Sequence, residues 1–237
     1  MKSTNRLPDE LKPSSNDYTV SGLKSVLGAV PVAGSLLSEI AGTVIPNQRV
    51  DRIADFARKL ELRVSHLEHS FFEREIKNEE FTDLVEESLR QAARATTDDR
   101  REYLASLLAT SLNSKDIEYA ESHHLLRILS ELSDIEVIWL RFYSNPSLGG
   151  DDEFRDLHKD VLGPVEAALG SDQNEIDKEA LQKSYKAHLE RLGLISGKVK
   201  TDKNKNPEFD KLSGEFKRQS LRTTALGGLL LRNIDLL

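Results

Sequence analysis

The chain of 237 residues contains no cysteine, which excludes disulfides, thiolate zinc sites and a cysteine nucleophile. Aromatic residues make up only 6% of the chain, so large aromatic binding platforms are not expected. The formal net charge of -7 provides no general attraction to phosphates or to anionic lipids. Charged residues reach 31% and hydrophobic residues 38%, a balance that does not suit a polytopic membrane protein.

The sequence also lacks the common local signatures of an enzyme. It has neither a G-x-S-x-G nucleophile motif nor a phosphate-binding loop. His66 and His69 have a spacing that metal ligands use, but HLEH is one residue short of the helical zinc-protease motif. The acidic runs at residues 86–87 and 151–153 indicate solvated surface, since nothing predicts a cleft around them. We therefore expect a non-enzymatic protein without a metal site or a cofactor.

The first 46 residues divide into a polar arm and an apolar segment. Residues 1–21 are rich in Ser, Asn and Pro and carry acidic side chains, which is typical of a disordered arm and not of a secretion signal. This favours a cytoplasmic location. Residues 22–46 are apolar and contain several glycines and two prolines, and Glu39 is the only charge after Lys24.

The apolar segment allows three interpretations: packing inside the protein, conditional contact with a membrane, and permanent spanning. Pro31 and Glu39 argue against a permanent transmembrane helix. Small residues recur every fourth position and would form a narrow helix face that permits close packing. We therefore predict a buried element that can be released for oligomerisation or membrane contact. Its candidate residues are Val30, Gly34, Leu37, Ser38, Ile40 and Gly42.

Residues 47–132 have the pattern of a helical bundle. Apolar residues from Val50 to Phe71 recur at spacings of three and four, which predicts one long helix that pairs with its neighbours. Further helices are predicted near residues 78–95, 99–114 and 117–132. The predicted packing positions on the long helix are Val50, Ile53, Leu60, Val64 and Leu67.

Residues 133–237 have the element order of a winged helix. Ser133 to Glu136 spells a capping box for a helix that stops at Asn145, and a shorter helix near residues 154–169 follows. A longer helix ends at Gly193, followed by a strand, a polar loop, a return strand near residues 219–223 and a last helix capped by Thr223 or Thr224. The predicted fold class is therefore mainly α, a helical bundle followed by a winged-helix-like module with a small β-hairpin.

A winged helix can bind DNA, and the C-terminal part of this chain is basic. Residues 184–237 hold eleven Lys or Arg against six Asp or Glu. A helix could enter the major groove while the wing contacts phosphate. Acidic residues dilute the candidate recognition helix, however, and no row of Arg or Asn is placed to read base edges. The candidate nucleic-acid contacts are Lys183, Lys186, Lys198 and Lys200.

Several stretches together resemble the abortive-infection alpha family of bacterial anti-phage proteins. They are REYLASLLATSL, LSELSDIEVIWL, LERLGLI and TALGGLLLRNI, and the resemblance covers most of the chain after Gly22. The resemblance implies antiviral defence and brings no established catalytic residue with it.

We therefore expect a non-enzymatic defence or stress-response protein that acts through a protein partner or as a homo-oligomer. The folded part would hold residues 25–45 at rest, and a signal would release them for oligomerisation or for peripheral contact with the inner face of the cell membrane. The alternative is a winged-helix transcriptional regulator that binds DNA, with residues 50–71 as its dimer seam. A third interpretation is a structural adaptor that recruits a neighbouring protein.

Overall fold

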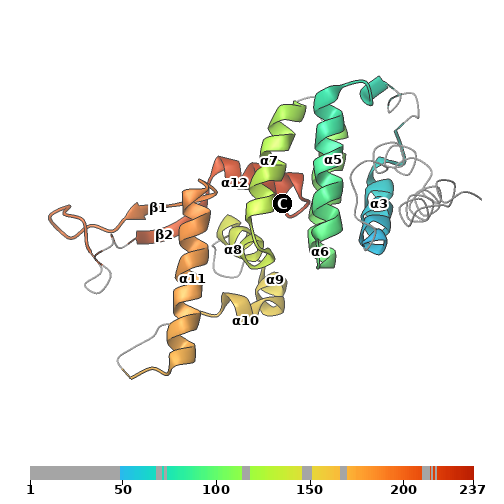
Figure 1. Ribbon diagram of the computed structural model, residues 1–237. Coiled ribbons are helices and arrows are strands. Elements are labelled where there is room, and N and C mark those ends of the chain that lie inside the picture. The colour runs from blue at the N-terminus through green and yellow to red at the C-terminus, as the bar shows by residue number, and fades with distance from the viewer. Residues whose placement is uncertain are drawn as a thin grey trace, which may run out of the picture. The chain divides into compact units, whose positions relative to one another are not determined.

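A computed structural model describes residues 49–67, 71, 74–113, 118–145, 151–165, 170–209, 214, 216 and 218–237. The chain divides between Leu126 and Arg127 into two compact units, called here the N-terminal and the C-terminal unit. The predicted arm at residues 1–21 and the apolar segment at residues 22–46 lie outside the described residues. The fold is mainly helical with a small antiparallel β-hairpin near the C-terminus, which confirms the predicted class (Figure 1).

The N-terminal unit is built from α3 (Val50–Val64), α5 (Glu79–Arg94), α6 (Asp98–Asn113) and the first part of α7 (Tyr119–Glu131). The last three match the predicted helices within a few residues. Helix α3 packs mainly against α6 and also contacts α5. The core at this contact contains fully buried side chains from each helix, among them Ile53, Phe56, Leu60, Phe81, Leu84, Leu104 and Leu107.

The predicted long helix from Val50 to Phe71 is wrong in its length, because α3 ends at Val64. The backbone N–H of Ser65 still reaches Glu61, and the chain then leaves the helix in a tight turn that includes Leu67. Predicted packing residues Ile53, Leu60 and Val64 are fully buried, whereas Leu67 is half-buried in that turn. The backbone of Val50 starts the helix, and its side chain lies outside the described residues.

The chain just after α3 contacts the last residue of α6. Helix α6 ends at Asn113, whose side-chain Oδ1 lies 3.1 Å from Nε2 of His66 just after α3. The predicted packing face also omitted Phe56, which is fully buried beside Ala57, because the apolar stripe is wider than a two-helix seam.

A network of ion pairs joins α3 to α6 at the edge of this core. Nζ of Lys59 lies 3.1 Å from carboxylate oxygens of both Asp98 and Glu102, and Nη2 of Arg63 lies 2.6 Å from Glu102. Burial acts to raise the pKa of Glu102, but hydrogen bonds from Arg63 and Lys59 outweigh it and hold that pKa below its usual value. The hydrogen bond from Lys59 is the main cause that lowers the pKa of Asp98.

The C-terminal unit continues from the end of α7. It contains α8 (Asp134–Ser144), α9 (Asp152–Leu157), α10 (Lys159–Leu162), α11 (Gln173–Arg191), β1 (Ile195–Val199), β2 (Arg218–Thr223) and α12 (Ala225–Asn233). Helix α8 is central, because α10, α11, β2 and α12 all contact it. The predicted capping box at its start is confirmed by reciprocal hydrogen bonds between Ser133 and Glu136.

Local end signals also set the remaining boundaries of this unit. Gly193 follows α11 with a φ of 70°, and the N–H of Leu194 bonds back to the carbonyl of Leu189 at 3.0 Å. Strands β1 and β2 pair antiparallel, with Ile195 opposite Thr223, and Thr224 caps α12. The element order is the one predicted, except that two short helices, α9 and α10, interrupted at His158, lie where one helix was predicted near residues 154–169. The assignment as a winged helix stays a prediction. None of the helices in the described part of the chain has the length and hydropathy needed to cross a membrane.

Candidate functional site

An apolar pocket of about 200 Å³ lies between α8, α10 and α11 and is called here the α11 pocket. Its lining combines six apolar or aromatic side chains with three polar ones. The apolar set is Ile135, Trp139, Val161, Val165, Leu181 and Tyr185, and the polar set is Asp160, Lys178 and Gln182. A largely apolar lining with a few polar groups is the usual composition of a binding pocket.

Hydrogen bonds to α11 hold one wall of the pocket in place. The side-chain amide of Gln182 donates to the backbone carbonyl of Gly163 at 2.8 Å and to that of Val161 at 3.4 Å. These contacts tie the end of α10 to the middle of α11. The side of the pocket formed by α10 is therefore fixed to α11 by hydrogen bonds between residues distant in sequence.

The other wall contains the only tryptophan of the chain, Trp139. Its indole N–H is buried and has no hydrogen-bond partner among the described residues. Nζ of Lys186 lies 4.5 Å from the centre of its ring, a cation–π contact. Burial, with a smaller contribution from the nearby charge of Lys183, lowers the pKa of Lys186.

Two exposed apolar side chains line this pocket. Leu181 on α11 is 53% exposed and Ile135 on α8 is 36% exposed. Single exposed apolar residues are common, but two that line one apolar pocket indicate an interaction surface. The helix that a winged-helix regulator would use to read DNA thus carries an apolar surface here.

The four lysines named as possible nucleic-acid contacts lie on α11 and on the hairpin. Lys183 pairs with Glu179 at 3.0 Å, and Lys200 pairs with Glu208 at 2.9 Å. Such exposed pairs are weak and could open for a phosphate, but each acidic partner also lowers the positive potential of the surface. Lys186 is held over Trp139, and Lys198 is exposed on β1. The structure therefore groups Lys183 and Lys186 on one helix without forming a continuous cationic surface from them.

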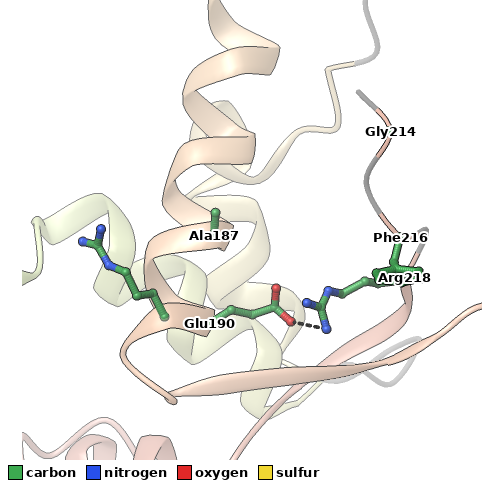
Figure 2. Close-up of a pocket in the computed structure, with 6 residues that line it drawn as sticks. Ala187, Glu190, Gly214, Phe216 and Arg218 are labelled. Carbon is green, nitrogen blue, oxygen red and sulfur yellow. Dashed lines mark ion pairs between the residues drawn. The ribbon is translucent and has the colours of Figure 1, made fainter. Parts of the chain in front are cut away.

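A second pocket of about 500 Å³ lies between α11 and the hairpin (Figure 2). Figure 2 shows Glu190 on α11 reaching Arg218 at the start of β2, with Oε1 and Nη1 3.0 Å apart. The same nitrogen of Arg218 donates to the carbonyl of Gly197 at 3.3 Å. Glu190 also acts on Tyr143 in α8, outside the lining of this pocket: burial, with the negative charge of Glu190, raises the pKa of Tyr143 to about 12. The pocket is thus of mixed charge, and one of its guanidinium groups is already neutralised.

The histidine and acidic motifs do not converge on a metal site within the described residues, where no group of three or more potential ligands occurs. His66 contacts Asn113, and His69 lies outside the described part of the chain. Glu86 and Glu87 both pair with Arg90 on their own helix.

The sequence did not predict the α11 pocket, because three separate helices build it. One available signal was the presence of Leu181 in a helix whose other residues are mostly polar or charged. The six candidate residues of the membrane or oligomerisation segment, Val30 to Gly42, lie outside the described residues, so their placement stays a prediction.

Comparison with known proteins supports the resemblance seen in the sequence. A family model described as abortive infection alpha matches residues 48–234. The match spans α3 to α12 and therefore includes both units. No curated protein and no solved structure matches the chain significantly. Because the matched region covers most of the chain, the protein belongs to the abortive infection alpha family.

Proposed function

We propose that the chain performs the abortive-infection-type defence that its family indicates by binding another protein through the α11 pocket, without catalysing a reaction. The observation that carries the proposal is the apolar surface of this pocket, on which Leu181 stays 53% exposed. The partner would be a helical segment that inserts apolar side chains and places an acidic residue near Lys178. Burying apolar side chains in such a pocket is the main source of affinity in helix-in-groove complexes.

The second element of the proposal is the apolar segment at residues 25–45. Its only charge is Glu39, and its small residues at positions 34, 38 and 42 would allow close helix contacts. In the resting cytoplasmic protein the segment is packed against protein. A signal from an infecting phage or from the bound partner releases it for oligomerisation or for contact with the inner face of the cell membrane.

Infection assays with a matched pair of variants test the pocket. Leu181→Glu places a charge on the pocket, whereas Leu157→Glu makes the same change on α9, where Leu157 is 77% exposed and does not line the pocket. Cells that express the Leu181 variant should lose protection against phage, and cells that express the Leu157 variant should keep it. Circular dichroism of both variants checks that they fold. Full protection by a folded Leu181 variant would reject the pocket as the interaction site.

The apolar segment is tested in the full chain by the double variant Leu37→Asp with Ile40→Asp. We expect infected cells with this variant to survive the infection individually and to release more phage, because the segment can no longer pack or enter a membrane. Fractionation of infected cells should also show less of the chain in the membrane fraction. Unchanged cell death and unchanged fractionation would remove the segment from the mechanism.

The DNA-binding alternative makes a different prediction for the same chain. It requires salt-sensitive binding to duplex DNA that weakens when Lys183, Lys186 and Lys200 are neutralised. The acidic partners Glu179 and Glu208 work against such binding. Duplex binding at low salt that falls in the triple Lys→Gln variant would favour the alternative over the protein-binding proposal.

A further inference from the structure

Two phenylalanines form an exposed pair on the hairpin between β1 and β2. Phe209 is 52% exposed and Phe216 is 50% exposed, and their ring centres lie 4.7 Å apart at an interplanar angle of 32°. A backbone bridge joins the two residues, so the pair is held by the hairpin and not by chance side-chain contact. Two exposed, paired aromatic rings leave apolar area in water that a partner surface would bury at a gain in free energy.

The adjacent turn presents cations. Asp202 closes the turn, because its side-chain Oδ1 accepts the N–H groups of Asn204 at 2.8 Å and Asn206 at 2.9 Å. Hydrogen bonds from Asn206 are the largest cause that lowers the pKa of Asp202. The same turn exposes Lys203 and Lys205, and Lys205 has a φ of 64°. The carboxylate is thus engaged by amide groups, while the two ammonium groups face solvent.

We propose that this hairpin docks on an anionic phospholipid surface, with Phe209 and Phe216 entering the interfacial layer and the lysines contacting the lipid head groups. Aromatic rings partition into the membrane interface, and nearby basic residues add attraction to anionic lipids. The described residues between positions 196 and 218 include five Lys or Arg and two Asp or Glu. Lys200 pairs with Glu208 and Arg218 pairs with Glu190, so the positive charge offered to such a surface comes from Lys198, Lys203 and Lys205. The net charge of -7 does not prevent this, because charges more than about 10 Å away are largely screened.

Single-stranded nucleic acid is the other ligand that uses aromatic rings with cations. It needs open ring faces for stacking beside a cationic groove that follows the backbone. Here the two rings cover one another in part, and the pocket beside Phe216 contains Glu190 next to Arg218 (Figure 2). A membrane requires only exposed apolar area and nearby positive charge, so the observations favour the lipid surface.

Vesicle co-sedimentation of the full chain tests the proposal. Phosphatidylcholine vesicles with phosphatidylglycerol should bind the chain, and vesicles of phosphatidylcholine alone should bind it much less. The double variant Phe209→Ser with Phe216→Ser should lower the partition coefficient at least about tenfold, because two half-exposed rings are lost. Lys203→Gln and Lys205→Asn should each lower it about fivefold. Asparagine is chosen at position 205 because it tolerates the left-handed backbone.

Matched controls separate the hairpin from the rest of the chain. Leu62→Ser removes an 80% exposed apolar side chain on α3, and Lys77→Gln removes an exposed cation; neither should change binding. The Leu181→Glu variant should also bind vesicles normally, so this experiment tests the hairpin independently of the α11 pocket. Equal binding by the wild type and the Phe209/Phe216 variant would overturn the inference. The inference would also be overturned, in favour of nucleic acid, by a different pair of results. In that case the wild type binds labelled oligothymidine but not vesicles, and the Phe209/Phe216 variant loses the oligothymidine binding.

Discussion

Replacing Gly227 with alanine should destabilise the C-terminal unit, because α12 begins in close contact with the backbone of Leu194. An alanine Cβ at this position would lie 2.2 Å from the carbonyl oxygen of Leu194 and 2.8 Å from Cγ2 of Thr223. The carbonyl of Leu194 cannot move freely, since it accepts the N–H of Thr224 at 2.9 Å. The added methyl group would therefore push α12 away from the start of the hairpin.

The expected loss follows from two opposing contributions. Forcing a methyl group against fixed backbone costs about 3 kcal/mol, the upper part of the range for overpacking. The higher helix propensity of alanine returns up to about 1 kcal/mol, which leaves a net loss of about 2 kcal/mol. Gly228 is the matched control, because its nearest atom would be Nη1 of Arg232 at 3.3 Å, the end of a flexible side chain. Gly228→Ala should therefore stabilise the unit by up to about 1 kcal/mol.

Urea unfolding followed by tryptophan fluorescence measures this difference. Trp139 is the only tryptophan and lies in α8, so its signal reports on the C-terminal unit separately from the N-terminal one. With a urea m-value of about 2 kcal/mol/M, the midpoint should fall by about 1 M in Gly227→Ala and rise in Gly228→Ala. A midpoint for Gly227→Ala at or above that of the wild type would refute the steric argument.

Three further predictions concern caps and charges. Ser133→Ala should destabilise α8 by about 1 kcal/mol through loss of the capping box, measured by the same fluorescence. Gly193→Ala should destabilise the C-terminal unit by about 1 kcal/mol, because the position needs a positive φ. The space around an added Cβ is open, so no steric clash adds to this backbone strain, and an unchanged urea midpoint would contradict the prediction. Acid should weaken the N-terminal unit: the lowered pKa values of Glu102 and Asp98 stabilise it above their usual values of 4.5 and 3.8, and this stability is lost as the pH falls through the lowered values. Circular dichroism against pH should show a smaller acid loss in Glu102→Gln than in the wild type.

Helix ends were the most predictable features of this chain. The capping box at Ser133, the stop at Gly193 and the cap near Thr224 were all expected and are present. Each depends on atoms within a few residues of one another, so the sequence contains the whole interaction. The same reasoning explains why α5, α6 and α7 were located within a few residues.

The length of α3 and the α11 pocket were not predictable in this way. The apolar pattern continues to Phe71, but the helix ends at Val64 beside the end of α6. The pocket requires Trp139, Val161 and Leu181 to meet from three helices. Local periodicity does not encode which side chains distant in sequence meet.

The sequence by itself determined the mainly helical class, most helix boundaries and the family, because periodicity, capping and a family pattern can be read from residues in order. Only the tertiary structure decided which charges are neutralised and which apolar residues remain exposed. Lys186 is half-buried over Trp139, whereas Leu181 on the same helix stays exposed, and nothing in the local sequence distinguishes these outcomes. Burial depends on neighbours that are distant in sequence. The free energy that a surface can contribute to binding depends on how much of its apolar area is left unburied.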